Sequence, residues 1–405
     1  MSKKELAFIG AWGADLQGVN NPEAGDGGIK VYAINEQGEA ELSDKVTPQV
    51  NAGSISVSSS GLYLYATDER KDLGGVHGNG GGVCAYKINS RTGDLTFLNE
   101  VSSAGAYPCY ITVDSKLRYA FASNHGNHEE VITKSVRTKN GTYVAKRFFD
   151  EGSIAMFPIL PDGSLGECCE LKALEGDSIL PLFQWTSHPH SVCLDPTEKF
   201  LLCGDKGCDL IRVFKIDYTN GKLTAVWEQE TEQGSGPRHL VFHPTLPVVY
   251  CNSEQNHTVH AYLFDSETGR MAHSDRAVTV PDEYTPSEDT TDIFAKNQTA
   301  DICLHKSGQY LYVSNRGHNS VATYRLDEEG KMALIGIYPS GGEIPRSMNF
   351  DKTGDSLYVV NQRTGNIAKF AVEGDTGALA FTGISINVDN PASIQFSAVK
   401  AADPF

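Results

Sequence analysis

Three stretches of the chain repeat one phrase: SGLYLYA at residues 60–66, SGQYLYV at residues 307–313 and TGDSLYV at residues 353–359. In each, a turn that contains glycine leads into a strand in which apolar and polar positions alternate. Weaker copies of the phrase end at Phe121, Leu202 and Tyr250. A turn-and-strand unit that recurs at a period of roughly 45 to 60 residues is the sequence signature of a β-propeller.

The clearest repeat reads as four strands joined by short turns. It begins at residues 238–242, continues through residues 248–252 and 258–264, and ends in an outer strand after the turn at residues 265–269. The Asp, Ser, Thr and Gly residues between these strands favour tight turns. Aligning the chain on this unit predicts six four-stranded antiparallel blades, which start near Ser54, Cys109, His190, Arg238, Asp301 and Arg346.

The two ends of the chain supply the pieces of one more blade. Residues 6–34 contain strands but lack a first strand, and residues 391–396 read as a lone first strand. Pairing the terminal strands in one sheet would close the ring and remove exposed sheet edges. We therefore expect residues 1–405 to form a single all-β domain, a seven-bladed β-propeller whose N- and C-terminal strands share the closing blade.

Two long segments interrupt the repeat, at about residues 125–151 and 273–297. Long insertions in a compact array are usually functional loops or tolerated surface excursions. The first follows directly on a strand end, so we expect it to act as a lid. The second is rich in Asp, Glu, Thr and Pro.

Charge and composition limit the partners of the chain. The formal net charge of −17 argues against a nucleic-acid partner, because phosphate backbones require a basic surface. No apolar run approaches the length of a membrane span, and the N-terminus has no long apolar signal region. The nine cysteines are odd in number and include no zinc-type CxxC pair. We expect a soluble, cytoplasmic protein that is a monomer or a weak homodimer.

Ionisable residues gather at two offsets of the repeat. The first offset, where each blade begins, holds Ser54, Cys109, His190, Arg238, Asp301 and Arg346. The second, just past the second strand, holds Glu69, His125, Lys206, Glu254, Arg316 and Gln362. Any one of these residues is equally well explained as a solvated turn residue. A set that offers a base, an acid and fixed cations from successive blades is the usual marker of a functional site.

The motifs around these offsets resemble the lactonase propeller family. They are GPRH at residues 236–239 with His243-Pro244, Asn252-Ser253-Glu254, HPH at residues 188–190 with Asp195-Pro196, and VSNRGHNSV at residues 313–321. That family is similar to bacterial propeller-type 6-phosphogluconolactonases and to the fungal 3-carboxy-cis,cis-muconate lactonising enzyme. The resemblance covers nearly the whole chain, with the two insertions as departures. Carried over from the muconate branch, it implicates His190, Arg238, Glu254 and Arg316.

The resemblance implies hydrolysis of a small anionic lactone, with 6-phosphogluconolactone as the expected substrate. Glu254 would activate water as a general base, provided that its environment raises its pKa toward neutrality. His190 would protonate the leaving ring oxygen or hydrogen-bond the carbonyl. Arg238 and Arg316 suit a phosphate or carboxylate, and one of them would stabilise the oxyanion. Further substrate contacts are expected from Arg346, His125, Lys206 and Glu69.

Two other functions remain open at this stage. The same four residues would serve a cycloisomerase that forms a lactone from a muconate, where the enzyme mainly delivers a proton. A non-catalytic scaffold that binds another protein is the third reading, because propellers host many functions. The ring of ionisable residues favours an enzyme over a scaffold.

We expect no metal and no organic cofactor. His188 and His190 on one strand point to opposite faces, so they chelate together only across a bulge. His125 and His128 with Glu129 form a ligand set only if their loop folds back. Residues 74–82 are rich in glycine but lack the order of a phosphate-binding loop.

Nucleophilic catalysis by a side chain is also disfavoured. The chain has no G-x-S-x-G elbow between a strand and a helix. The remaining histidines considered, His239, His243, His257 and His260, are expected to be ordinary residues of strands and turns.

Overall fold

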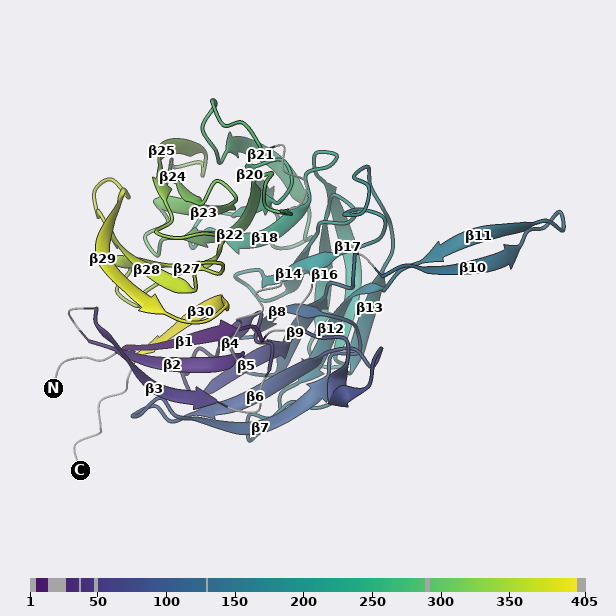
Figure 1. Cartoon of the computed structure of the whole chain (residues 1–405), viewed down its shortest axis with the longest axis horizontal. Coiled ribbons are helices and arrows are strands. Elements are labelled where there is room, and N and C mark those ends of the chain that lie inside the picture. Colours follow the sequence, from purple (N-terminus) through teal and green to yellow (C-terminus); the bar gives the residue numbers. More distant parts are fainter. Residues whose placement is uncertain are drawn as a thin grey trace.

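The computed structural model describes residues 5–13, 27–35, 38–46, 50–128, 130–287 and 292–398. Within these residues the chain forms seven four-stranded antiparallel sheets and one two-stranded ribbon. The sheets are arranged as blades around a common centre (Figure 1). The predicted all-β, seven-bladed propeller is confirmed. One short 3-10 helix, Leu73–Gly75, is the only helix in the described part of the chain, and no helix there is long and apolar enough to cross a membrane.

The strands of each blade run outward from the channel in chain order. The first three blades consist of β4 Ile55–Val57, β5 Tyr63–Asp68, β6 Gly82–Ile88 and β7 Leu95–Ser102; β8 Pro108–Val113, β9 Tyr119–Asn124, β12 Gly152–Pro158 and β13 Glu170–Leu174; and β14 Pro189–Leu194, β15 Phe200–Asp205, β16 Leu210–Asp217 and β17 Lys222–Glu230. The next three consist of β18 Pro237–Phe242, β19 Val248–Ser253, β20 Thr258–Phe264 and β21 Met271–Val278; β22 Gln298–Leu304, β23 Tyr310–Arg316, β24 Ser320–Leu326 and β25 Met332–Pro339; and β26 Pro345–Phe350, β27 Ser356–Asn361, β28 Asn366–Val372 and β29 Leu379–Asn387.

The seventh blade joins the two ends of the chain, as the sequence predicts. It consists of β30 Pro391–Ala398, β1 Glu5–Ala11, β2 Gly28–Ile34 and β3 Ala40–Val46. β30 is the first strand of this blade and pairs antiparallel with β1, with Ala7 opposite Phe396 and Glu5 opposite Ala398. The ring is therefore closed by main-chain hydrogen bonds between its terminal strands.

The core lies between neighbouring blades. One apolar cluster, for example, combines Val248 and Tyr250 of one blade with Val313 and Tyr324 of the next. This arrangement follows from the alternation in each strand, because both faces of a propeller blade are covered by its neighbours and bury apolar side chains.

Tyrosines of the repeated phrase link three of the blades to the blade that follows each. The hydroxyl groups of Tyr65, Tyr250 and Tyr312 donate hydrogen bonds to the carbonyls of Gly163 (3.0 Å), Gly330 (2.8 Å) and Gly377 (2.8 Å). Each of these glycines has a positive φ and lies in the turn before the outer strand of the following blade. The phrase therefore encodes the contact between blades as well as the second strand of each.

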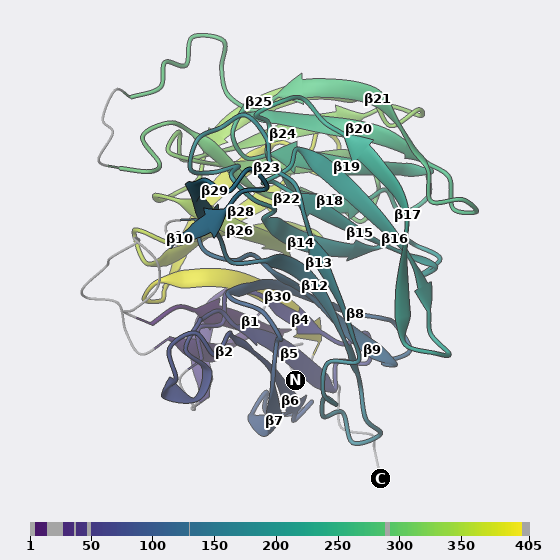
Figure 2. The ribbon, with the colours of Figure 1, turned by 90° about the vertical axis from the view of Figure 1, so that its right-hand side faces the viewer.

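The first insertion forms the ribbon of β10 Ile132–Arg137 and β11 Tyr143–Phe148, whose side chains are almost all exposed. The ribbon projects outward from the propeller and is seen nearly end-on from the side (Figures 1 and 2). The expectation of a lid is therefore wrong for the strands of this insertion. The second insertion begins later than expected, since residues 273–278 belong to β21, and residues 288–291 lie outside the described part.

We predict that Tyr250→Phe lowers the free energy of unfolding by about 1 kcal/mol, because the buried carbonyl of Gly330 loses its donor while the ring remains packed. Urea unfolding followed by tryptophan fluorescence would measure the change. Tyr218→Phe is the matched control, because the buried Tyr218 hydroxyl oxygen has no hydrogen-bond partner among the described residues. Equal effects of the two substitutions would contradict the proposed link between blades.

Candidate active site

Both offsets singled out in the sequence open on the same face of the propeller. A first strand begins where the antiparallel second strand ends, so Pro237 pairs with Ser253 and Pro189 pairs with Asp205. Arg238 and Glu254, which follow these pairs, lie at the same end of their blade. The geometry of the repeat thus brings the two sets of residues together around one mouth of the channel.

The strand pairing changes two members of the first set. Most first strands carry a bulge at this point. Counting back from the pair Ile55–Ala66 places Gly53 at the first offset, where the sequence predicts Ser54. Counting back from the pair Ile302–Val313 places Ala300 there, where the sequence predicts Asp301. The complete ring, blade by blade, is Gly53, Cys109, His190, Arg238, Ala300, Arg346 and Ala392. A Cβ atom on Gly53 would lie 1.9 Å from Oε2 of Glu69, so a side chain at this position would displace the Glu69 carboxyl group.

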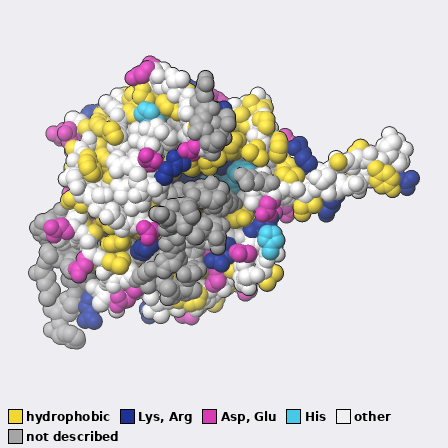
Figure 3. Space-filling view, in the orientation of Figure 1, with side chains coloured by type: hydrophobic (Ala, Val, Ile, Leu, Met, Phe, Trp, Pro, Cys, Tyr) yellow, Lys and Arg dark blue, Asp and Glu magenta, His cyan; other side chains and the backbone are white. Residues whose placement is uncertain are grey.

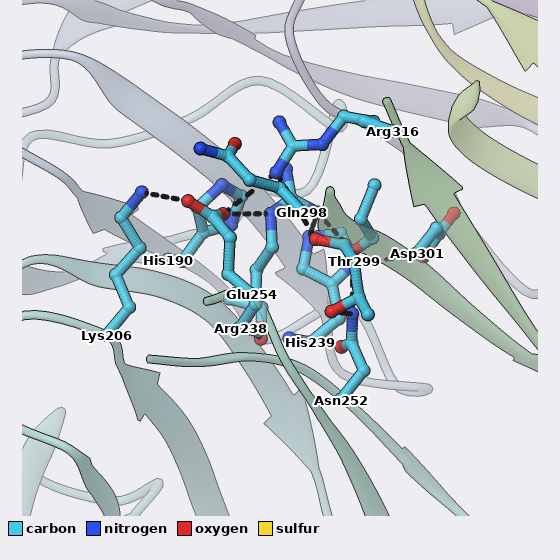
Figure 4. A network of polar contacts seen from close by, with 12 residues as sticks. His190, Lys206, Arg238, His239, Asn252, Glu254, Gln298, Thr299, Asp301 and Arg316 are labelled. Carbon is cyan, nitrogen blue, oxygen red and sulfur yellow. Dashed lines mark hydrogen bonds and ion pairs between the residues drawn. The ribbon is translucent and has the colours of Figure 1, made fainter. Parts of the chain in front are cut away.

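Glu254 is the centre of a buried charge cluster (Figure 4). Its Oε1 lies 2.9 Å from Nζ of Lys206, and its Oε2 lies 2.9 Å from Nε of Arg238 and 3.1 Å from Nη2 of Arg316. Gln255 also donates a side-chain hydrogen bond to Oε1, over 3.1 Å. One carboxylate therefore contacts three cations that come from three different blades.

These cations decide the ionisation of Glu254. Burial by itself would raise the pKa of Glu254, but the charges of Lys206, Arg316 and Arg238 outweigh it and hold that pKa well below its ordinary value. A carboxylate in this state is a weak base. The expectation that the environment of Glu254 raises its pKa toward neutrality is therefore wrong, and its function as a general base loses its premise.

Arg238 is a fixed bridge inside the cluster, with a side chain that is 1% exposed. Besides Glu254, it contacts Nε2 of His239 over 3.0 Å and the carbonyl of Ala300. His239 in turn donates from Nδ1 to Asp301 over 2.8 Å. The sequence analysis treats His239 as an ordinary strand residue, whereas its hydrogen bonds make it part of this network.

A second group at the same mouth contains Glu69, Arg346 and Trp12. The guanidinium of Arg346 lies 4.0 Å from the centre of the Trp12 ring. Burial raises the pKa of Glu69 to about 7, although Arg346 opposes this rise. Oε2 of Glu69 is buried beside the Trp12 side chain, whose indole N–H also opposes the rise of this pKa. At this mouth of the channel, the carboxyl group whose pKa lies near neutrality is therefore that of Glu69 and not that of Glu254.

His190 and His125 complete the predicted set, and their ring centres are 5.7 Å apart. Burial, reinforced by neighbouring cations such as Arg238 for His190 and Lys206 for His125, holds the pKa of each well below its ordinary value. Both are therefore neutral imidazoles at neutral pH. Nδ1 of His190 is buried without a hydrogen-bond partner among the described residues.

Cys109 occupies the ring position of the blade that also carries His125. Burial raises the pKa of its thiol to about 12, so it stays protonated and unreactive.

The first strands enclose a central cavity of about 270 Å³ whose lining includes His190, Arg238 and Arg346. The small residues at three other ring positions leave space at the centre of the ring. In the space-filling view, histidine and basic side chains border a hollow beside the root of the ribbon (Figure 3). Three of the eight predicted site residues, His190, Arg238 and Arg346, line this cavity. The other five lie at or directly after the ends of second strands, at the same end of the blades: Glu69, His125, Lys206, Glu254 and Arg316.

Comparison with known proteins agrees with this architecture. A family model described as a lactonase with a seven-bladed β-propeller matches residues 20–396. A 6-phosphogluconolactonase of Bacillus subtilis is 25% identical over 376 residues, which are 92% of this chain and 95% of the relative. One from Formosa agariphila is 28% identical over 91% of this chain and 95% of the relative. A Bacteroides fragilis protein described as a candidate 6-phosphogluconolactonase superimposes with a TM-score of 0.79 at 25% identity, over 98% of both chains.

We predict that Glu254→Gln lowers the free energy of unfolding by about 3–5 kcal/mol at neutral pH, because it leaves buried cations without their counter-charge. Since the folded pKa of Glu254 is depressed, the stabilisation is present above the ordinary glutamate value of 4.5 and is lost as the pH falls through the folded pKa. The difference between variant and wild type in urea unfolding should therefore shrink in acid.

Glu267→Gln provides the control for this measurement. Glu267 also forms an ion pair, with Lys199 at 2.8 Å, but its side chain is largely exposed, so its loss should change stability little. A pH-independent effect of Glu254→Gln would refute the assignment of its charge.

Proposed function

The chain belongs to the lactonase seven-bladed β-propeller family, and we propose that it hydrolyses a sugar lactone, 6-phosphogluconolactone, to the open-chain acid, 6-phosphogluconate. The relatives named 6-phosphogluconolactonase support this choice of substrate. The proposal rests above all on one observation, the excess of buried positive charge around Glu254.

Four cations, Lys206, Arg238, Arg316 and Arg346, surround this mouth of the channel in a chain whose formal net charge is −17. Glu254 balances part of their charge, and the rest attracts an anionic ligand against the field of the whole protein. Nε of Arg316 is buried and has no partner among the described residues. Such a donor gains a charge-assisted hydrogen bond when a phosphate or an oxyanion enters.

Burial lowers the pKa of Arg316 to about 9 and that of Arg346 to about 10, yet both remain protonated at neutral pH. Arg316 is also stacked against Phe294, with 5.1 Å between the guanidinium carbon and the ring centre. Cations held in fixed positions stabilise developing negative charge without reorganisation during the reaction.

Two carboxyl groups at one site with opposite pKa shifts indicate a division of labour. In the proposed reaction Glu69 accepts a proton from water as the water oxygen adds to the lactone carbonyl. Arg316 and Lys206 stabilise the oxyanion, and His190, as a neutral imidazole, hydrogen-bonds the substrate. Collapse of the tetrahedral intermediate breaks the bond from C1 to the ring oxygen, which takes the proton from Glu69. Glu254 holds the cations in place throughout.

Ring opening of 6-phosphogluconolactone, followed by NMR and corrected for the spontaneous rate, tests the proposal. We predict that Arg316→Ala lowers kcat/KM by about 10²–10³-fold, since it removes an oxyanion donor. Arg316→Lys should recover only part of the loss, because an ammonium lacks the planar guanidinium fork. Arg325→Ala, an exposed residue of β24, is the control and should match wild type.

Hydrolysis by the wild type no faster than the spontaneous rate would refute the lactonase assignment. Loss of diene absorbance from carboxymuconate in the same sample would then identify a cycloisomerase. No reaction with either compound would favour a scaffold.

The pH profile isolates Glu69. Because a general base must be ionised, we predict that kcat/KM rises with pH through about 7 and that Glu69→Gln removes this rise and lowers kcat/KM by about 10²–10⁴-fold. Glu100→Gln is a matched control: burial raises the pKa of Glu100 to about 7 as well, but Glu100 lies on the outer strand β7. A profile that survives in Glu69→Gln would assign the base to another group.

A further inference from the structure

Three histidines from two blades converge beside the proposed active site. His125 follows β9, His128 lies three residues further along the same loop, and His188 immediately precedes β14. Their ring centres are separated by 4.8 Å (His125–His188), 4.7 Å (His125–His128) and 4.1 Å (His128–His188). One ring nitrogen from each lies within 4.8 Å of one nitrogen of each of the others.

Hydrogen bonds determine which nitrogen of two rings carries a lone pair. Nδ1 of His188 donates to the carbonyl of His125 over 2.8 Å, and Nδ1 of His125 donates to the carbonyl of Gly126 over 2.9 Å. Because a carbonyl only accepts, both Nδ1 atoms carry the proton, and each Nε2 retains its lone pair. This is the arrangement in which metal-ligating histidines are held by outer hydrogen bonds.

Two of the remaining nitrogens lack partners among the described residues. Nε2 of His125 and Nδ1 of His128 are buried and have no hydrogen bond to any described residue. Buried polar atoms are normally paired, so an unpaired group requires an explanation. We propose that His125, His128 and His188 form a binding site for a divalent transition-metal ion, with Zn²⁺ as the expected ion.

Hydrogen bonds and ion pairs hold the segments that carry the triad. The backbone N–H of His188 donates to Oδ1 of Asp205 over 2.9 Å, and Nε of Arg212 lies 2.9 Å from Oδ2 of the same carboxylate. The loop that carries His128 is held by Lys71, whose Nζ contacts Glu130 Oε2 at 2.5 Å and Asp150 Oδ1 at 2.9 Å. His128 is the least buried of the three and adjusts most easily. Nitrogens bound to one tetrahedral ion are about 3.4 Å apart, given a bond of about 2.1 Å, so binding would draw together nitrogens that now lie within 4.8 Å of one another.

The donor set selects the class of metal. Three neutral imidazoles suit Zn²⁺, Co²⁺, Ni²⁺ and Cu²⁺, whereas Mg²⁺ and Ca²⁺ prefer oxygen ligands. The ammonium of Lys206 opposes a cation at this place, but its partner Glu254 offsets that charge. Three protein ligands leave at least one position of a tetrahedral ion for water or another small ligand.

The site adjoins the proposed active site, because His125 contacts His190 as well as the triad. If the proposed function is right, the open position takes an oxygen of the substrate. Binding of the ion itself does not depend on the proposed function, because it is measured without any substrate.

Titration of chelator-treated full-length protein with ZnCl₂ in a calorimeter tests the site. We expect one ion per chain in the wild type. His128→Ala, a loop substitution that leaves the blades intact, should weaken binding by more than the roughly 10–100-fold that loss of an outer-shell partner costs. His125→Gln should do the same, and His77→Ala, an exposed histidine in another loop, should not. MgCl₂ should give no binding.

Co²⁺ serves as the spectroscopic probe. The Co²⁺ form of the wild type should show the visible bands of a four-coordinate ion, and azide should shift them by entering the open position. Absence of Zn²⁺ uptake by the wild type, or uptake undiminished in both His128→Ala and His125→Gln, overturns the site. Bands that azide leaves unchanged overturn the open position. Absence of lactonase activity in the wild type would overturn the proposed function and would leave the metal site standing.

Discussion

Antiparallel pairing between β1 and β30 closes the circle of blades, and the rest of the structure depends on it. Without this pairing the first and last sheets would each present an unpaired edge, which invites association with other chains. With it, the first strands of all blades face one channel. Only then do residues from blades far apart in the sequence, such as Glu69 and Arg346, meet around one opening.

Closure places a buried charge cluster at that opening, and two carboxyl groups there differ in their pKa values. Glu254 and Glu69 follow equivalent strand ends, yet one contacts three cations and the other faces Gly53 and Trp12. Desolvation acts on both carboxyl groups in the same direction. Coulomb attraction exceeds it only at Glu254, so one group stays ionised and the other titrates near neutral pH. A fold with repeated geometry thus supplies two chemically different carboxyl groups.

Much of the fold could be predicted from the sequence, because turns and alternating strands are local patterns. The repeated phrase at residues 60–66 and its copies predicts the blades, and the missing strands at the two ends predict the closing sheet. Two of the predicted residues at the first offset, Ser54 and Asp301, are wrong by one position. The bulges that begin β22 and its equivalents add a residue without a local signal, so Asp301 replaced Ala300 in the expected ring. The expectation that the first insertion covers the site is wrong for its strands, because their side chains are almost all exposed and do not pack against the propeller.

The sequence by itself determined the strand order, the number of blades and which ionisable residues recur at the two offsets, because each depends on spacing along the chain. Only the tertiary structure decided the ionisation of Glu254 and Glu69, since pKa values depend on distances between groups from different blades. The tertiary structure also brings His125, His128 and His188 close together. In the sequence, His188 is next but one to His190, and His125 lies three residues before His128. The contact that unites the three runs between blades, where sequence separation carries no information about distance.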